Sequence, residues 1–233
     1  MPRCTNRGLE AGIMLSSALF DLDGLLVDTE IITLRIYRDL VGQYGHDMSR
    51  MTYAERYSGH NDEDNMRSII ERYRLPITME EGLTFVFQSE AAYLREGVDL
   101  KPGVHELLSW LSEHGFAIAL ASASAPEREH MLLAQHGIDH FFSAYAFSSE
   151  VEQGKPAPDV FLLAAKRLQT SPGDCVVFED SEAGVRAGHA GGMAVVCVPD
   201  MHHPAPEVAR LANLVTDRLD QAIPFLEQAI SHS

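Results

Sequence analysis

Four short runs of consecutive apolar residues mark this chain, and they cover 18–20, 117–121, 175–178 and 194–198. Continuous rather than alternating apolarity is typical of strands that are buried on both faces of a parallel sheet. Around these runs, apolar residues recur with helical spacing over 104–113, 127–136, 159–168 and 182–190. An alternation of buried strands and helices predicts an α/β fold with a doubly wound parallel sheet and right-handed crossovers.

The segment 30–98 breaks this rhythm, because its pattern indicates several helices and no strong strand candidate. It is flanked on one side by Asp28-Thr29 and on the other by the stretch from Gly97 to Gly103, which contains Pro102. These flanks would be the two crossings into an inserted subdomain. At 233 residues the chain is long enough for two apolar interiors. We therefore expect residues 1–29 and 99–233 to form the core domain and residues 30–98 to form a helical insertion.

Polar side chains follow the apolar runs. Asp21 and Asp23 come after the first run, Ser122 after the second, and Glu179 with Asp180 after the run 175–178. In an open α/β sheet, ligands bind at the carboxyl ends of the strands. The sequence therefore predicts that these five residues converge on one site.

The charge of the chain narrows the class of partner. A formal net charge of −16 argues against nucleic acid, since binding a phosphate backbone requires a basic surface. No apolar stretch approaches the length of a membrane span, and we expect a cytoplasmic monomer. The three cysteines, Cys4, Cys175 and Cys197, have no metal-ligand spacing, and the last two are interpreted as buried apolar residues.

The sequence Asp21-Leu22-Asp23-Gly24 places two carboxylates at one strand end, where Gly24 allows a sharp turn. One carboxylate can attack phosphorus and form an aspartyl-phosphate, while the other moves protons. Two like charges about 4 Å apart repel by roughly 4 kcal/mol at an effective dielectric of 20. Gathering these residues with Glu179 and Asp180 therefore requires a cation, and oxygen ligands favour Mg²⁺.

Two further positions can bind a phosphate group. Lys155 lies in a loop rich in glycine and proline, where its ammonium could pair with both Asp21 and a phosphate oxygen. Ser122 and Ala123 would offer a hydroxyl and a backbone N–H to the other oxygens. An alternative interpretation makes Ser122 a helix N-cap ahead of Pro126.

Four sequence motifs, taken together and in order, resemble those of the haloacid dehalogenase superfamily. They are FDLDGLLVDTE from Phe20, ALASAS from Ala119, GKPAPDVF from Gly154 and FEDSEAGV from Phe178, and they cover about residues 16–199. The resemblance implies a Rossmann-like core with an all-helical cap. The cap resembles the type found in beta-phosphoglucomutase and in sugar-phosphate and pseudouridine-phosphate phosphatases.

This resemblance also implies roles for the residues. Asp21 would be the nucleophile, Asp23 the acid and base, and Ser122 and Lys155 the phosphate-binding groups. The Asp21 side chain, the Asp23 backbone carbonyl and Asp180 would hold Mg²⁺, with Glu179 near or behind the ion. Because adjacent residues of a strand point in opposite directions, Asp180 is preferred over Glu179 as a ligand.

The activity that we expect is hydrolysis of a small phosphate ester. Beta-phosphoglucomutase carries groups for a second phosphate where this chain has Thr33, Ala125 and Pro126, so their absence favours a phosphatase over a phosphomutase. The second aspartate, Asp23, argues against a dehalogenase. A phospho-acceptor signalling module also pairs strand-end aspartates with Mg²⁺ and a lysine, but it would lack the long insertion.

One polar stretch of the insertion, residues 55–61, is a candidate specificity loop. Gly59 lies among polar residues between two expected helices, which would allow the loop to reach the substrate. We name Arg56, His60 and Asn61 as its candidate substrate contacts.

Overall fold

The computed structural model describes residues 14–58 and 62–230 of the chain. It divides into two compact units. The core unit comprises the described residues of Met1–Val27 and Leu100–Ser233, and the inserted unit those of Asp28–Asp99. The range 30–98, expected to be a helical insertion, lies within the inserted unit.

The core unit contains one parallel sheet with the strand order β3-β2-β1-β4-β5-β6. Its strands are β1 (Ser17–Phe20), β2 (Ala117–Ser122), β3 (Ala144–Phe147), β4 (Cys175–Glu179), β5 (Ala194–Cys197) and β6 (Leu214–Val215). The strand order runs in opposite directions on the two sides of the β1–β4 pair, which makes this pair the topological switch point. The predicted doubly wound parallel sheet is confirmed.

Two strands of this sheet were not expected from apolar runs. In β3, the half-buried Tyr145 interrupts the apolar pattern, and β6 is only two residues long. Both lie at an edge of the sheet, where a strand has a neighbour on one side only. An edge strand needs less continuous apolarity than a central one, which explains why the pattern missed them.

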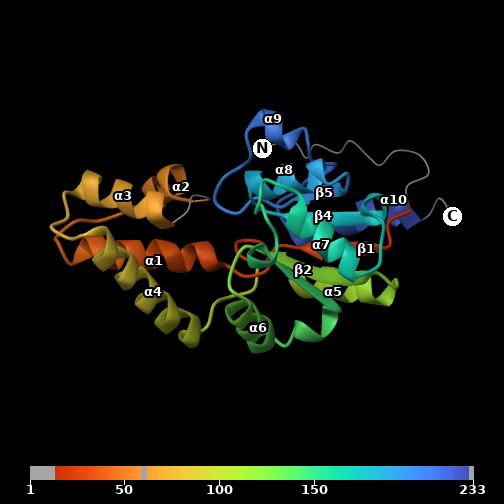
Figure 1. Ribbon diagram of the computed structural model, residues 1–233, viewed down its shortest axis with the longest axis horizontal. Coiled ribbons are helices and arrows are strands. Elements are labelled where there is room, and N and C mark those ends of the chain that lie inside the picture. Colours follow the sequence, from red (N-terminus) through yellow and green to blue (C-terminus); the bar gives the residue numbers. More distant parts are fainter. Residues whose placement is uncertain (1–13, 59–61, 231–233) are drawn as a thin grey trace. The chain divides into compact units, whose positions relative to one another are not determined.

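Helices lie between the strands of the core unit and after the last strand, and they flank the sheet (Figure 1). They are α5 (Val104–Glu113), α6 (Pro126–Gln135), α7 (Asp159–Arg167), α8 (Glu182–Ala190), α9 (Pro206–Ala209) and α10 (Ile223–Ile230). Local signals set their starts: α6 begins with Pro126 in its first turn, and the Ser181 hydroxyl caps α8 by accepting from the Gly184 N–H at 3.1 Å. Within the described ranges, no helix combines the length and apolarity that a membrane crossing requires.

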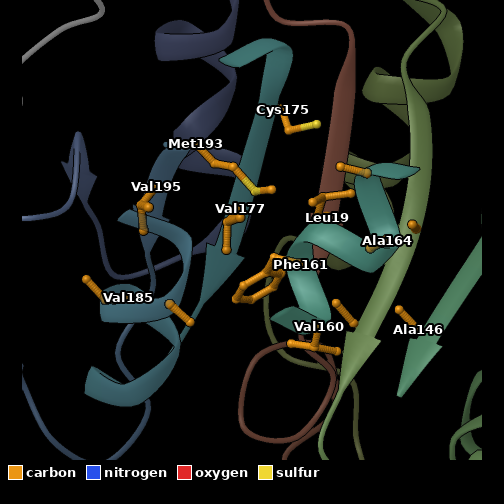
Figure 2. Packing of buried hydrophobic residues seen from close by; sticks show 14 of the residues in the cluster. Leu19, Ala146, Val160, Phe161, Ala164, Cys175, Val177, Val185, Met193 and Val195 are labelled. Carbon is orange, nitrogen blue, oxygen red and sulfur yellow. The ribbon is translucent and has the colours of Figure 1, made fainter. Parts of the chain in front are cut away.

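Apolar side chains of α7 and α8 pack against the central strands in one buried cluster (Figure 2). Leu19 of β1 and Val177 of β4 are fully buried there, together with Phe161 of α7. Truncating a buried phenylalanine to alanine typically costs about 3–5 kcal/mol. This packing fixes the position of α7, and hence of the loop before it, against the carboxyl ends of the strands. Cys175 and Cys197 are buried and are not in a disulfide, as expected, and burial raises the pKa of the Cys175 thiol to about 11.

The inserted unit is helical in its described part. Its helices are α1 (Thr29–Gly42), α2 (Arg50–Arg56), α3 (Asp62–Tyr73) and α4 (Met79–Glu96). Ser49 caps α2 by accepting from the Thr52 N–H at 3.0 Å, and Thr78 forms a capping box with Glu81 at the start of α4. The two ends of the unit meet, because the Asp28 N–H donates to the Asp99 carbonyl at 2.9 Å.

Three buried tyrosines form the centre of the inserted unit. The ring centroids of Tyr37, Tyr53 and Tyr57 lie 5.9 to 6.4 Å apart. Two of the hydroxyls bond to carboxylates: Tyr37 donates to Asp62 at 3.1 Å and Tyr53 donates to Glu30 at 2.8 Å. Tyr37 and Tyr53 thus fill the interior with their rings while their hydroxyls retain a partner, whereas the buried Tyr57 hydroxyl has none among the described residues.

Candidate active site

Asp21 and Asp23 lie at the carboxyl end of β1, on a tight turn. The Asp21 N–H continues the ladder to β4 by donating to the Phe178 carbonyl at 3.2 Å. The chain then turns at Gly24, whose φ of +73° is a conformation that residues with a Cβ rarely adopt, and the Gly24 N–H donates to Val27 at 2.9 Å. Both carboxylates are therefore presented at the same edge of the sheet, at the switch point.

The Lys155 ammonium lies between two buried carboxylates. It forms ion pairs with Asp21 and with Glu179, the latter at 2.6 Å, and it donates to the Ala121 carbonyl at 3.0 Å. It also lies 4.8 Å from the centre of the Phe161 ring. Lys155 therefore links the ends of β1, β2 and β4, the convergence that the sequence predicted for Asp21 and Glu179.

Burial and charge act in opposite directions in this cluster. Burial raises the pKa of the Asp21 carboxyl group to about 7, Lys155 opposes that rise, and the charges of Glu179 and Asp23 add to it. Burial alone would lower the pKa of Lys155, but the two carboxylates outweigh it and raise the pKa. The shared proton therefore stays on Lys155. A further cation near Asp21 would favour the ionised carboxylate that a nucleophile requires.

Glu179 supports Lys155 from behind. Its Oε1 accepts a hydrogen bond from the Lys155 ammonium. Its Oε2 accepts from the N–H groups of Asp180 and Ser181, both at 3.1 Å, and from the Ser181 hydroxyl at 2.9 Å. Gly184 makes room for this carboxylate, because a Cβ there would lie 1.8 Å from the Glu179 Cδ. Both oxygens of Glu179 are thus engaged within the protein, which suits a residue that fixes Lys155.

Asp23 is bound by an arginine that sequence reasoning missed. The two guanidinium nitrogens of Arg128 donate to the two carboxylate oxygens of Asp23 at 2.8 and 2.9 Å, and the Ser124 hydroxyl donates to Oδ2 at 2.7 Å. Arg128 lies in the first turn of α6, which begins just after the ALASAS stretch. A helix that starts at a strand end has its first turn at the same edge of the sheet. This position in the sequence was the signal that could have identified Arg128.

Glu129 is a second residue that the sequence did not indicate. It is fully buried, and its Oε1 accepts from the Arg128 guanidinium at 2.9 Å. Its Oε2 is also buried and has no hydrogen-bond partner among the described residues. Burial raises the pKa of Glu129 to about 8, and the charge of Asp23 adds to the rise while Arg128 opposes it.

Ser122 and Ala123 lie where β2 ends. Ser122 is buried, and its hydroxyl accepts from the Ser124 N–H at 3.1 Å, whereas Ala123 is exposed. The N-cap position of α6 is Ala125, which makes no side-chain cap, so the N-cap interpretation of Ser122 is wrong.

The chemistry of the donor set fits Mg²⁺. Asp180 Oδ2 lies 2.4 Å from the point where a Cβ on Gly24 would be, and Asp200 Oδ2 lies 3.4 Å from that same point. Asp200 is a further residue that the sequence did not indicate, and it forms an ion pair with Lys101 at 2.5 Å. Within the described ranges, no three His, Cys, Asp or Glu side chains form a metal cage. Mg²⁺ does not need one, because it usually takes one or two carboxylates and completes its coordination with waters and substrate phosphate.

The candidate specificity residues of the insertion are only partly described. Arg56 is the last residue of α2 and is exposed. His60 and Asn61 lie outside the described residues. Their assignment as substrate contacts stays a prediction.

The chain is similar to known proteins over most of its length. Residues 18–198 match the family model described as Haloacid dehalogenase-like hydrolase. The chain is 35% identical over 187 residues to the bifunctional riboflavin kinase/FMN phosphatase of Arabidopsis thaliana, a match that covers 80% of this chain and 49%, about half, of that relative. It is also 35% identical over 196 residues to a probable pseudouridine-5'-phosphatase of Drosophila melanogaster, covering 80% of this chain and 82% of that one.

A solved structure shares the fold. The beta-phosphoglucomutase of Clostridium difficile superposes with a TM-score of 0.72 at 26% identity, over 94% of this chain and 98% of that one. These similarities confirm the family that the sequence motifs suggested.

Proposed function

Because the chain belongs to the haloacid dehalogenase-like hydrolase family, we propose that it hydrolyses a small phosphorylated metabolite through an aspartyl-phosphate on Asp21. The chain is a phosphoric monoester hydrolase, as expected. The observation that carries the proposed mechanism is the Lys155 ammonium, which bonds to both Asp21 and Glu179 at the carboxyl ends of the central strands. It supplies a fixed positive charge at the point where an anionic ester would meet an anionic nucleophile.

The reaction has two displacements. In the first, an Asp21 carboxylate oxygen attacks phosphorus, the bond to the ester oxygen breaks, and the Asp23 carboxyl group gives its proton to the leaving oxygen. In the second, Asp23 takes a proton from water as that water attacks phosphorus, and the bond to Asp21 breaks. The products are the alcohol and inorganic phosphate. Ser122 and the Ala123 N–H are assigned to the phosphate oxygens, with Lys155 and the turn at Gly24.

Mg²⁺ is the proposed cofactor. The Asp21 and Asp180 carboxylates and the Asp23 backbone carbonyl would hold it. When bound, it would neutralise charge on the phosphate and on Asp21. Glu179 is assigned to Lys155 rather than to the ion, because both of its oxygens already have protein partners.

Substrate choice is assigned to the helical insertion, which we propose acts as a cap. Insertions of this kind select the substrate and exclude bulk water in many enzymes. Arg56, His60 and Asn61 are the candidate contacts. The relatives named above support small monoesters as the substrate class.

A phosphomutase is the alternative within the family, because one structural relative is a beta-phosphoglucomutase. Thr33, Ala125 and Pro126 offer no cationic or amide side chain to a second phosphate. Hydrolysis is therefore favoured.

The test is phosphate release from a panel of sugar, polyol and nucleoside monophosphates, with Mg²⁺ and after its removal by a chelator. We expect release only with Mg²⁺, and its loss in Asp21→Asn, while the exposed Asp217→Asn serves as the matched control. An Asp21→Asn protein that retains turnover would disprove the nucleophile. Isomerisation of a sugar phosphate without net phosphate release would instead establish the mutase.

A further inference from the structure

Asp200 lies beside a residue that is assigned to Mg²⁺, but it has no role in the proposed reaction. It follows β5, and its Oδ2 lies 3.4 Å from the point where a Cβ on Gly24 would be, while Asp180 Oδ2 lies 2.4 Å from that point. We propose that Asp200 is a positioning residue of the Mg²⁺ site, whose charge helps to hold the ion and is partly offset by Lys101. This inference rests on the proposed function, in which Mg²⁺ is the cofactor.

The turn at Gly24 brings the two aspartates to one place. Gly24 follows Asp23, whose backbone carbonyl is assigned to the ion, and it has no Cβ to keep the turn away from Asp180 and Asp200. Carboxylate oxygens are the ligands that Mg²⁺ prefers, and two like charges so close repel less when a cation lies beside them. The charge of Asp200 therefore acts on an ion that Asp180 would hold.

Burial makes this charge effective. The side chain of Asp200 is only 5% exposed, and that of its ion-pair partner Lys101 is 18% exposed. Solvent and salt screen an exposed charge strongly, but they screen a buried charge much less. A buried ion pair is also costly to desolvate and is often no more stabilising than apolar residues of the same volume. A nearby metal ion therefore explains the presence of this carboxylate better than stability does.

Lys101 holds Asp200 by its other oxygen. The Lys101 ammonium bonds to Asp200 Oδ1 at 2.5 Å, whereas Oδ2 is the oxygen that lies near Gly24. The Lys101 backbone N–H donates to the Leu26 carbonyl at 2.9 Å, in the turn that contains Gly24. Lys101 is thus held through both its backbone and its side chain. It orients the carboxylate and offsets part of its charge.

The two members of the ion pair should therefore act on Mg²⁺ in opposite directions. Mg²⁺ dehydrates reluctantly and keeps several waters, so a carboxylate beside its ligands holds it by charge and by accepting hydrogen bonds from those waters. Loss of Asp200 removes an attraction to the ion, whereas loss of Lys101 removes a repulsion. An ion pair that only stabilised the fold would act in one direction, whichever partner was removed.

The experiment measures metal binding by the full chain, apart from catalysis. Mn²⁺, which suits the same oxygen ligands, is titrated into the metal-free protein, and the loss of the free-ion EPR signal reports the bound ion. Mg²⁺ is then added as the competitor, which gives its Kd. The variants are Asp200→Asn, Lys101→Met and the two combined. Asp217→Asn and Lys166→Met, both at exposed positions, are the matched controls.

We expect Asp200→Asn to raise the Kd of Mg²⁺ by about 10- to 100-fold, the effect typical of removing a partner beside the metal ligands. Lys101→Met should lower the Kd by about two- to tenfold, because the charge of Asp200 is then no longer offset. The combined variant should lie between the two, and the controls should match wild type. The Mg²⁺ concentration that gives half-maximal phosphate release should change in the same order.

An unchanged Kd in Asp200→Asn would overturn the inference and leave the proposed function standing. A Kd that rises in Lys101→Met as much as in Asp200→Asn would also overturn it, because both changes would then report a structural ion pair. Thermal unfolding of each metal-free variant identifies loss of fold. If Asp200→Asn unfolds, Lys101→Met decides alone, since only a lower Kd agrees with the inference. A wild-type protein that binds neither ion would instead end the proposed cofactor itself.

Discussion

The two units of the molecule bury their polar groups in opposite ways. The core unit buries charge: Asp21, Glu179 and Lys155 share one cluster, and their side chains are nearly inaccessible. The inserted unit buries phenols, with Tyr37 and Tyr53 donating to carboxylates at its edge. Burial raises the pKa of both tyrosines, so they remain neutral at any physiological pH.

This difference indicates that the buried charges of the core unit serve catalysis, whereas the buried tyrosines of the inserted unit serve packing. A buried ion pair is expensive to desolvate and is often no more stabilising than apolar residues of similar volume. Its presence at the strand ends of the core unit therefore indicates a functional requirement, in agreement with the proposed nucleophile. A neutral hydroxyl with a partner costs little and gives a helical interior a defined packing. Four substitutions test this contrast through the free energy of unfolding.

The largest effect is expected for Lys155→Met. Removing the ammonium leaves Asp21 and Glu179 buried without their cation, and such a loss typically costs about 3–5 kcal/mol. Urea unfolding at pH 7 without Mg²⁺ measures it, with the exposed Lys166→Met as control. Equal stability of the two variants would mean that the cluster carries no buried charge.

Gly184→Ala should come next, with a loss of about 2–3 kcal/mol. The new methyl group would overlap the Glu179 carboxylate, which cannot move without breaking its bonds to Lys155 and Ser181. Gly173→Ala, with no atom within 4 Å of the added Cβ, should change unfolding by less than about 1 kcal/mol. If Gly184→Ala unfolds like this control, the carboxylate is not fixed.

In the inserted unit, Tyr53→Phe should cost about 1 kcal/mol. The substitution keeps the ring and deletes only the hydroxyl that donates to Glu30 at 2.8 Å. The control is Tyr44→Phe at a partly exposed ring, and the same urea unfolding measures both. A loss as large as that of Lys155→Met would remove the contrast between the units.

The smallest effect is expected for Glu150→Gln, whose partner Arg167 lies at 2.8 Å on the surface of the core unit. The hydrogen bonds from Arg167 lower the pKa of Glu150 to about 2. Its contribution is therefore present above the ordinary pKa near 4.5 and is lost as the pH falls toward 2. Solvent screening keeps it below about 1 kcal/mol at pH 7.

Urea unfolding at pH 7 and at pH 3 should show a difference from wild type that shrinks at the lower pH. Glu152→Gln, exposed in the next loop, is the control. A difference that grows on acidification would contradict the assigned ion pair.

The sequence predicted the central strands and the charged cluster for a common reason. Strands buried on both faces are continuously apolar, and the residues after them must lie at one edge of the sheet. The sequence alone therefore predicted that Asp21 and Glu179 lie close together. Lys155 was proposed from its loop of glycine and proline, and the resemblance of that loop to a family motif supported the proposal.

What escaped prediction depends on packing rather than on pattern. Arg128 and Glu129 look like ordinary helix charges, and only the folded structure shows that Arg128 contacts Asp23 and that Glu129 contacts Arg128. Asp200 follows the end of β5 and therefore lies at the same edge of the sheet as Asp180, a position to which the strand-end rule was not applied. Edge strand β3 was missed because Tyr145 interrupts its apolar run.

The hydrogen bond between Asp28 and Asp99 has a practical consequence. Because the two ends of the inserted unit are adjacent, the segment between them can be exchanged as one unit. Chimeras that exchange residues 28–99 with the corresponding segment of a relative require no new linker, because the entry and exit of the chain are already adjacent. Such chimeras would test whether substrate preference follows the inserted unit while the core unit stays the same.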